Sequence, residues 1–213
     1  MAAETPGRIA EPPPHAPRVV LASTSPARRR MLDHAGVPVE ADAPGVDEAE
    51  VKAAFAADGA EPEQVAEALA EMKARRIADR QPGALVIGAD QMLTCDGRWY
   101  DKPESRAGAY AQLAALSGRT HRLVATAVII RDDTRLWHTT DSAELTMRPL
   151  STGFLEHYLD ALGDAVLQSV GGYQLEGLGA QLFTRVRGDY FTVLGLPLLP
   201  LLDFLREHEV VPT

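Results

Sequence analysis

The sequence predicts an α/β fold in a single domain, and three observations support this. The apolar run VVLA at residues 19–22 leads directly into a helix, and the apolar run ALVI at residues 84–87 follows a long helix at residues 62–80. Two β-type runs at residues 119–131 and 135–147 follow each other and predict a long antiparallel pair. With 213 residues, 46% of them hydrophobic, the chain can bury a sizeable core.

The composition narrows the classes of partner and compartment. With 30 acidic residues against 21 lysines and arginines, the net charge is −9, which argues against a general surface for nucleic acid or anionic membranes. Any anion site must therefore be a local basic pocket. The single cysteine, Cys95, excludes an intrachain disulfide and fits a reducing compartment. No apolar run approaches the roughly 20 residues of a membrane span and residues 1–18 lack an apolar signal-peptide core, so we expect a cytoplasmic protein.

The N-terminal segment and the first helix differ in character. Residues 1–17 are rich in proline and poor in apolar side chains, which predicts a flexible tail before a domain at residues 18–213. In the stretch VVLASTSPARRRML, hydroxyl residues can cap a helix that begins at Pro26. The three arginines that follow lie near the positive end of the helix dipole, where cations are unfavourable. A bound phosphate would explain them, but a capped surface helix with solvated arginines is an equally open interpretation.

The next elements follow from periodicity and turn residues. The first helix ends before Gly36, and a short strand at residues 37–41 leads into an acidic turn at residues 44–48. An alanine-rich helix then runs to a break near residues 58–59. The long helix at residues 62–80 has an apolar stripe along one face.

Turn residues organise the middle of the chain. The pair Asp96-Gly97 predicts a hairpin that brings Lys102 back near Asp90. A helix with apolar residues at helical spacing is expected at residues 104–116.

The C-terminal part begins with the long antiparallel pair already described. An amphipathic helix at residues 152–162 follows, and then a glycine-rich loop, GGYQLEGLGAQLF at residues 171–183, where backbones approach closely before a strand. Pro197 begins the closing helix.

Two carboxylates and two lysines carry the candidate chemistry. Asp90 follows an apolar run, and a buried carboxylate persists there only if it is neutralised, hydrogen-bonded or bound to a metal. With Glu48 it would offer two hard oxygen ligands suited to magnesium, while Lys73, Lys102 and the arginines would offset the charge of a triphosphate. Each residue taken alone also has an ordinary interpretation as a turn acid or a solvated lysine. His121 is expected to be a hydrogen-bonded structural residue.

Taken in order, these blocks resemble the Maf family of nucleoside triphosphate pyrophosphatases from Val20 to Glu207. The blocks are LASTSPARRRML, the Asp47-Glu48 pair, LAEMKA around Lys73, GADQ ending at Gln91, DKP around Lys102, LSGRTHRLVAT, and GGYQLEGLGAQLF followed by GDYFTVLGLPLLPLL. The resemblance implies an elongated mixed β-sheet flanked by helices, with two lobes around a central cleft, as in Maf and inosine triphosphatase proteins. It also implies hydrolysis of a nucleoside triphosphate between its α and β phosphates, a divalent metal cation (Mg²⁺ or Mn²⁺), and often a homodimer.

The resemblance also assigns roles residue by residue. Asp90 is similar to the catalytic carboxylate and metal ligand of the family, and Glu48 matches a second acidic position that would bind the metal. The positions that match the phosphate-binding residues of the family are Ser23, Ser25, Arg28, Arg29, Lys73 and Lys102. For Arg29, the alternative of an exposed helix residue stays open. Arg30 is expected to be a solvated helix residue.

Three further positions bear on the choice of base. The family subgroup that acts on dTTP and UTP has arginine, threonine and glutamine where this chain has Ala27, Gln91 and Glu176. Gln91 and Glu176 are more similar to the subgroup that acts on 7-methylguanosine triphosphate. A carboxylate suits that base because it can accept the N1 and N2 hydrogens of a guanine edge. That subgroup has an aromatic residue at the position of Ala27, which could stack on a base, whereas alanine cannot.

Two classes of function remain open on the sequence alone. One is a metal-dependent pyrophosphatase whose partner is a nucleoside triphosphate, modified or non-canonical, such as 7-methyl-GTP. The other is a nucleotide-binding regulator of cell division or septum formation that leaves the triphosphate intact. The two acidic positions favour the enzyme, because a protein that only binds gains nothing from an activated water.

Overall fold

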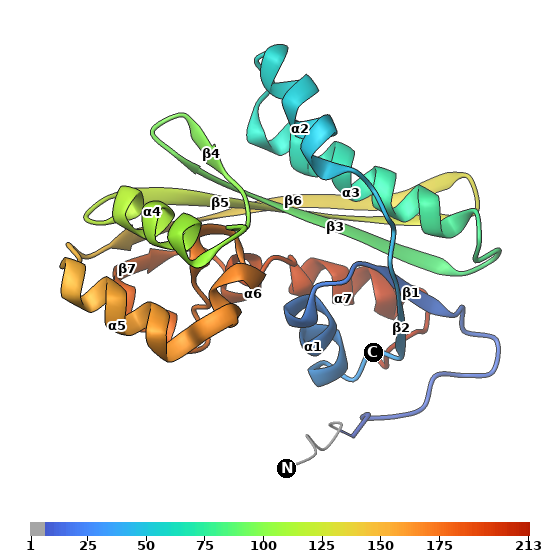
Figure 1. The fold of residues 1–213 in the computed structure, drawn as a ribbon. Coiled ribbons are helices and arrows are strands. Elements are labelled where there is room, and N and C mark those ends of the chain that lie inside the picture. The colour runs from blue at the N-terminus through green and yellow to red at the C-terminus, as the bar shows by residue number, and fades with distance from the viewer. Residues whose placement is uncertain (1–6) are drawn as a thin grey trace.

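A single mixed β-sheet organises the chain. The computed structural model describes residues 7–213, and its seven-stranded sheet has the order β2-β1-β3-β5-β6-β7, with β4 paired to β3 outside this path (Figure 1). β1 is parallel to β2 and β3, and the other pairs are antiparallel. The strands are β1 (Val19–Ala22), β2 (Val39–Asp42), β3 (Leu85–Cys95), β4 (Arg98–Tyr100), β5 (Thr120–Arg131), β6 (Thr134–Met147) and β7 (Phe183–Arg187).

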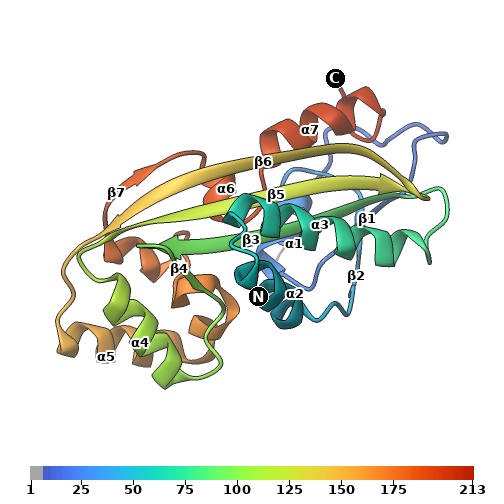
Figure 2. The ribbon, with the colours of Figure 1, turned by 90° about the horizontal axis from the view of Figure 1, so that it is seen from above.

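Helices cover both faces of this sheet. α3 lies along one face over β3 and β5, whereas α1 and α7 pack on the opposite face (Figure 1, Figure 2). The helices are α1 (Pro26–His34), α2 (Glu48–Ala57), α3 (Pro62–Ala78), α4 (Arg106–Leu116), α5 (Thr152–Leu162), α6 (Tyr190–Val193) and α7 (Leu198–Glu207). Three short 3₁₀ turns, η1 (Gly163–Gln168), η2 (Val170–Gly172) and η3 (Leu178–Leu182), connect α5 to β7.

The alternation of side chains along β3 explains these layers. Val86 packs in one cluster with Ala70 and Ala74 of α3, whereas Ile87 belongs to the cluster on the other face, together with Leu32 of α1. At the far end of the sheet, a separate buried cluster joins α4 and α5 to β5 and β6. The protein therefore has two lobes along one elongated sheet, which confirms the predicted fold class.

Most predicted elements are present with small shifts of their ends. α1, α2 and α4 begin after side-chain caps from Ser25, Asp47 and Ser105. The predicted hairpin joins β3 to β4 through Asp96 and Gly97, whose φ angles of 50° and 76° are those of a two-residue turn with positive φ at both positions. The four-residue helix α6 was not predicted.

The described part of the predicted N-terminal tail, residues 7–17, contains no helix or strand. It lies beside the end of the chain, where Nε2 of His15 is 2.6 Å from Oε2 of Glu209. Residues 1–6 of that tail lie outside the described residues. Among residues 7–213, no helix is both long enough and apolar enough to cross a membrane.

Candidate active site

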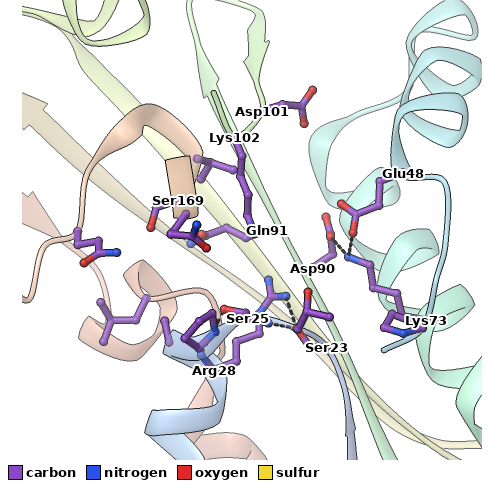
Figure 3. Close-up of a pocket in the computed structure, with 18 of the residues that line it drawn as sticks. Ser23, Ser25, Arg28, Glu48, Lys73, Asp90, Gln91, Asp101, Lys102 and Ser169 are labelled. Atoms are coloured by element: carbon purple, nitrogen blue, oxygen red, sulfur yellow. Dashed lines mark hydrogen bonds and ion pairs between the residues drawn. The ribbon is translucent and has the colours of Figure 1, made fainter. Parts of the chain in front are cut away.

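A cavity opens where β1 ends beside the middle of β3. The parallel register pairs Ala22 with Gly88, so β1 ends two residues before the level of Asp90, while β3 continues to Cys95. The carboxylate therefore lies inside a long strand, at the point where the pairing with β1 stops. A cavity of about 520 Å³ occupies this place, between α1, α2 and the turn from η1 to η2 (Figure 3).

Nine of the eleven residues singled out from the sequence line this cavity. They come from the junction of β1 and α1, from α2 and α3, from β3 and from the segment after β4. The nine are Ser23, Ser25, Ala27, Arg28, Glu48, Lys73, Asp90, Gln91 and Lys102. The sequence blocks, which are dispersed along the chain, thus converge on one place.

Lys73 bridges the two carboxylates. Its Nζ lies 2.6 Å from Oδ1 of Asp90 and 2.6 Å from Oε1 of Glu48 (Figure 3). The side chains of Lys73 and Asp90 are 5% and 4% exposed, so water does not screen this pair. Burial alone would raise the pKa of Glu48, but the ion pair with Lys73 and the charge of Lys52 outweigh it and hold that pKa below its usual value.

One oxygen of Asp90 is left without a partner. Oδ1 accepts a hydrogen bond from Lys73, whereas Oδ2 is buried and has no hydrogen-bond partner among the residues that the structure describes. An unpaired buried carboxylate oxygen is costly, which points to a cation or a proton donor supplied by a ligand. Residues 7–213 contain no group of three or more His, Cys, Asp or Glu side chains placed to hold a metal. A cation held by Asp90 and Glu48 would therefore take its other ligands from water and phosphate, as Mg²⁺ prefers.

Arg28 is a buried cation that joins three segments. Its Nε donates to the carbonyl of Gly195 at 2.8 Å, and its Nη1 donates to the carbonyl of Ala89 at 3.0 Å and to Oγ of Ser23 at 3.3 Å. Burial lowers the pKa of Arg28, and the charge of Asp90 counteracts this effect. None of these bonds uses Nη2, so the guanidinium can still donate to a phosphate oxygen.

Positive charge exceeds negative charge in the cavity. Its lining contains five cationic and four acidic side chains, namely Arg28, Arg30, Lys52, Lys73 and Lys102 against Glu48, Asp90, Asp101 and Glu104. Burial and the neighbouring charges of Arg28 and Lys73 lower the pKa of Lys102. A bound anion would relieve this repulsion. The cavity is therefore the kind of local basic pocket that an anion site needs in a chain of net charge −9.

Sequence reasoning missed several residues that line the cavity. Lys52 of α2 forms an ion pair with Asp101 and lies 3.9 Å from Glu48. Burial alone would lower the pKa of Lys52, but the hydrogen bond to Asp101 outweighs it and raises that pKa. The i, i+4 spacing of Glu48 and Lys52 could have revealed this pair. Gln174 lies in the glycine-rich block at residues 171–183 but was not singled out, whereas Ser169, in the turns after α5, had no signal of its own.

Arg29 lies outside the cavity that the other predicted phosphate-binding residues line. Its side chain is exposed and does not line the cavity, and its Nε lies 3.4 Å from Oδ2 of Asp33. Successive residues of an α-helix point about 100° apart, so when Arg28 faces the cavity its neighbour turns away. Arg30, which was expected to be solvated, is 52% exposed and also lines the cavity.

The residues predicted to select the base meet at a smaller hollow. Ala27, Gln91 and Glu176 line a space of about 30 Å³ that shares Ala27 and Gln91 with the main cavity, which Glu176 does not line. Nε2 of Gln91 donates to the carbonyls of Thr192 and Val193 in α6, at 3.1 and 3.0 Å. Because carbonyl oxygens only accept hydrogen bonds, the amide nitrogen must face α6, which leaves the acceptor Oε1 for a ligand.

His121 is a structural residue, as predicted. It is 2% exposed, and its Nε2 lies 2.7 Å from the hydroxyl of Tyr173. Burial lowers the pKa of His121 to about 4. The side chain does not line the cavity, so it has no direct part in the candidate site.

The fold and the cavity together define an α/β protein built to bind a multiply charged anion. The chain belongs to the Maf family, because the family model described as Maf-like protein matches residues 18–208. A nucleoside triphosphate pyrophosphatase from Paramagnetospirillum magneticum is 59% identical over 194 residues, which cover 91% of this chain and 100% of the relative. A protein of the same name from Rhodospirillum rubrum is 51% identical over 195 residues, 92% of this chain and 96% of the relative. A 7-methyl-GTP pyrophosphatase from Rhizobium etli is 48% identical over 191 residues, 90% of this chain and 96% of the relative.

Proposed function

We propose that the protein is a nucleoside triphosphate pyrophosphatase. It hydrolyses the bond between the α and β phosphates and releases a nucleoside monophosphate and pyrophosphate. The observation that carries this proposal is the unpartnered oxygen of buried Asp90 in a cavity lined by Arg28, Lys73 and Lys102. The names of the relatives, which are nucleoside triphosphate or 7-methyl-GTP pyrophosphatases, support it.

Asp90 is the proposed catalytic carboxylate. Because Lys73 holds Oδ1 at 2.6 Å, Oδ2 is the oxygen available to take up a proton from the water that attacks phosphorus. Lys73 is a positioning residue in this scheme. Its ion pairs with Asp90 and Glu48 fix the carboxylate of Asp90 in one orientation.

Asp90 and Glu48 are the proposed ligands of a divalent cation, Mg²⁺ or Mn²⁺. The carboxylates of Asp90 and Glu48, the second with a pKa below its usual value, are hard oxygen ligands that suit either ion. When bound, such a cation would polarise the phosphate and lower the pKa of a coordinated water. Lys73 balances the two carboxylates in the absence of the cation.

The phosphates would lie against the start of α1 and the cationic side of the cavity. Ser23 and Ser25 offer hydroxyl groups there, and Arg28 offers its Nη2. Lys73 and Lys102 would offset the charge of the triphosphate, and the repulsion that lowers the pKa of Lys102 would fall on binding.

The proposed base is a guanine, modified as in 7-methyl-GTP. Gln91 presents an acceptor because α6 occupies its amide nitrogen, and the carboxylate of Glu176 is a second acceptor beside the same hollow. Guanine carries two adjacent donors, N1–H and the N2 amino group, whereas uracil and thymine carry one donor between two acceptors. Ala27 adds no bulky side chain where this hollow meets the main cavity.

Replacement of the catalytic carboxylate tests this function. Pyrophosphate release is measured with Mg²⁺, Mn²⁺ or a chelator over a panel of canonical and methylated triphosphates, for the parent, Asp90→Asn and the control Asp203→Asn on the exposed face of α7. We expect kcat to fall about 10²-fold or more in Asp90→Asn and to stay unchanged in the control. An Asp90→Asn variant as fast as the parent means that the mechanism is wrong. A parent protein that binds triphosphate tightly and leaves it intact is a nucleotide-binding regulator instead.

Two further expectations stay predictions. A cytoplasmic location rests on the composition and on the single buried Cys95. The expectation of a homodimer rests on the family resemblance. The proposed small-molecule partner is the nucleotide.

A further inference from the structure

A further ion pair lies beside the small hollow that Gln91 and Ala27 line. Nη2 of Arg30 is 3.6 Å from Oε1 of Glu176, and this pair joins α1 to the loop between η2 and η3. Arg30 lines the main cavity, and both residues line an adjoining apolar hollow of about 500 Å³ between α1, α6 and α7. Within residues 7–213, Glu176 forms no other ion pair. Arg30 is therefore the one cation paired with this carboxylate in the part of the chain that the structure describes.

The place of Arg30 on α1 explains how it reaches the base site. It follows Ala27 by three residues, and residues with this spacing lie on the same face of a helix. Ala27 lines the main cavity, the small hollow and the apolar hollow, so the three spaces meet at its methyl group. The guanidinium of Arg30 extends from the next turn of the helix and pairs with Glu176 beside this junction.

This ion pair affects the charge of the site more than the stability of the fold. The side chains of Arg30 and Glu176 are 52% and 28% exposed, so water screens their attraction and the pair adds little to the stability of the fold. Without Arg30, however, Glu176 would present an uncompensated negative charge beside Gln91 and Ala27. The charge of the site, more than its stability, depends on the arginine.

We propose that Arg30 is a positioning residue that determines specificity: it holds the carboxylate of Glu176 beside the small hollow and offsets its charge. The inference rests on the proposed function, in which Gln91 and Glu176 contact the base. A neutral guanine is then recognised by the hydrogen bonds that its N1–H and N2 amino groups donate. Methylation at N7 puts a positive charge on the purine ring, and this charge gains little from a carboxylate that is already paired.

The test compares a cationic with a neutral base. The ratio of kcat/KM for 7-methyl-GTP over GTP is measured at slightly acid pH and low salt for the parent, Arg30→Met, Arg30→Lys and Arg29→Met. In Arg30→Met the uncovered carboxylate raises this ratio about two- to fivefold, mainly through KM, and added salt reduces the effect. Arg30→Lys keeps the charge and stays near the parent. Arg29→Met, which removes an arginine of the same helix outside the cavity, leaves the ratio unchanged.

A second variant separates positioning from a general loss of structure. In a Glu176→Gln background, Arg30→Met no longer raises the ratio, because no carboxylate remains to be uncovered. An unchanged ratio in Arg30→Met of an active parent, or an equal rise in Arg29→Met, overturns the role of Arg30. A parent that hydrolyses no triphosphate overturns the proposed function instead. In that case the ratio of the dissociation constants of the two nucleotides, measured by calorimetry, decides the role of Arg30.

Discussion

Lys73→Met removes the cation between two carboxylates and keeps the length of the side chain. In the parent, Lys73 forms two ion pairs of 2.6 Å, one with Asp90 and one with Glu48, and the variant lacks both. The two carboxylates differ in their access to water. The side chain of Asp90 is 4% exposed, so its charge stays buried without a partner, whereas that of Glu48 is 43% exposed and can be hydrated.

The expected loss follows from this difference. Removal of one partner of a buried ion pair costs about 3–5 kcal/mol, because the other charge is left uncompensated. Since water screens the half of the site at Glu48, we expect the lower end, about 3 kcal/mol of the free energy of unfolding. For a chain of this size, that loss lowers Tm by roughly 6–12 °C.

The assay is urea unfolding followed by circular dichroism at neutral pH. Lys73→Met is compared with the parent, with the double variant Lys73→Met/Asp90→Asn and with Arg76→Met, which removes an exposed cation of the same helix. The double variant regains most of the lost stability, because a neutral amide replaces the uncompensated charge. The control stays within about 0.5 kcal/mol of the parent.

Acid pH reduces the difference in the free energy of unfolding between the parent and Lys73→Met. The pKa of Glu48 is depressed in the folded parent, so its contribution to stability is present above the usual glutamate pKa and is lost as the pH falls through the folded-state value. If Lys73→Met unfolds within about 1 kcal/mol of the parent, or if Asp90→Asn makes it less stable, the uncompensated charge is not the cause.

Two other predictions concern Arg28 and His121. Arg28→Met lowers kcat/KM for the triphosphate about 10²-fold in steady-state assays, because a buried phosphate donor is lost. The control Arg29→Met stays within about twofold of the parent. Equal losses in the two variants would contradict the assignment of Arg28 to phosphate. His121, with its pKa lowered to about 4 by burial, binds fewer protons folded than unfolded between pH 4 and 6.5. Stability therefore falls by about 3 kcal/mol as the pH drops through that window. His121→Gln, which can still bond Tyr173, removes this part of the pH dependence in thermal melts; an unchanged profile would refute the cause.

The fold was predictable where short-range signals determine it. Ser25 caps α1 and Pro26 is its first residue, so two adjacent residues mark the start of the helix. Asp96 and Gly97 mark the tight turn from β3 to β4. These signals do not depend on tertiary contacts. The cap, the turn and the helical stripes therefore appeared in the sequence before any packing was known.

The parts that were missed depend on packing between distant segments. α6 has four residues, too few to show a helical period, and its carbonyls orient Gln91 from about a hundred positions away. The role of Gln91 as an acceptor is thus invisible until Thr192 and Val193 are placed beside it. Ser169 likewise enters the cavity through the turns after α5, which have no periodic pattern.

The three consecutive arginines show what a closer look at spacing could have added. Met31 and Leu32 are the buried apolar residues of α1, and Arg28 precedes them by three and four positions. These three residues share one face of the helix, so Arg28 is turned inward with them and Arg29 is turned outward. The apolar pattern therefore contained the information that separates the two arginines, although their charges are identical.

The geometry of the proposed catalytic pair depends on residues that carry no chemistry. A Cβ atom at Gly88 would lie 2.0 Å from the carbonyl oxygen of Ala70 and 2.8 Å from Cβ of Ala74, so α3 approaches β3 more closely than any larger side chain would allow. At this separation Nζ of Lys73, on α3, reaches Oδ1 of Asp90, two residues after the glycine, at 2.6 Å. The block GAD therefore acts as one unit. Its glycine sets the distance between helix and strand, and its aspartate supplies the carboxylate that this distance brings to the lysine.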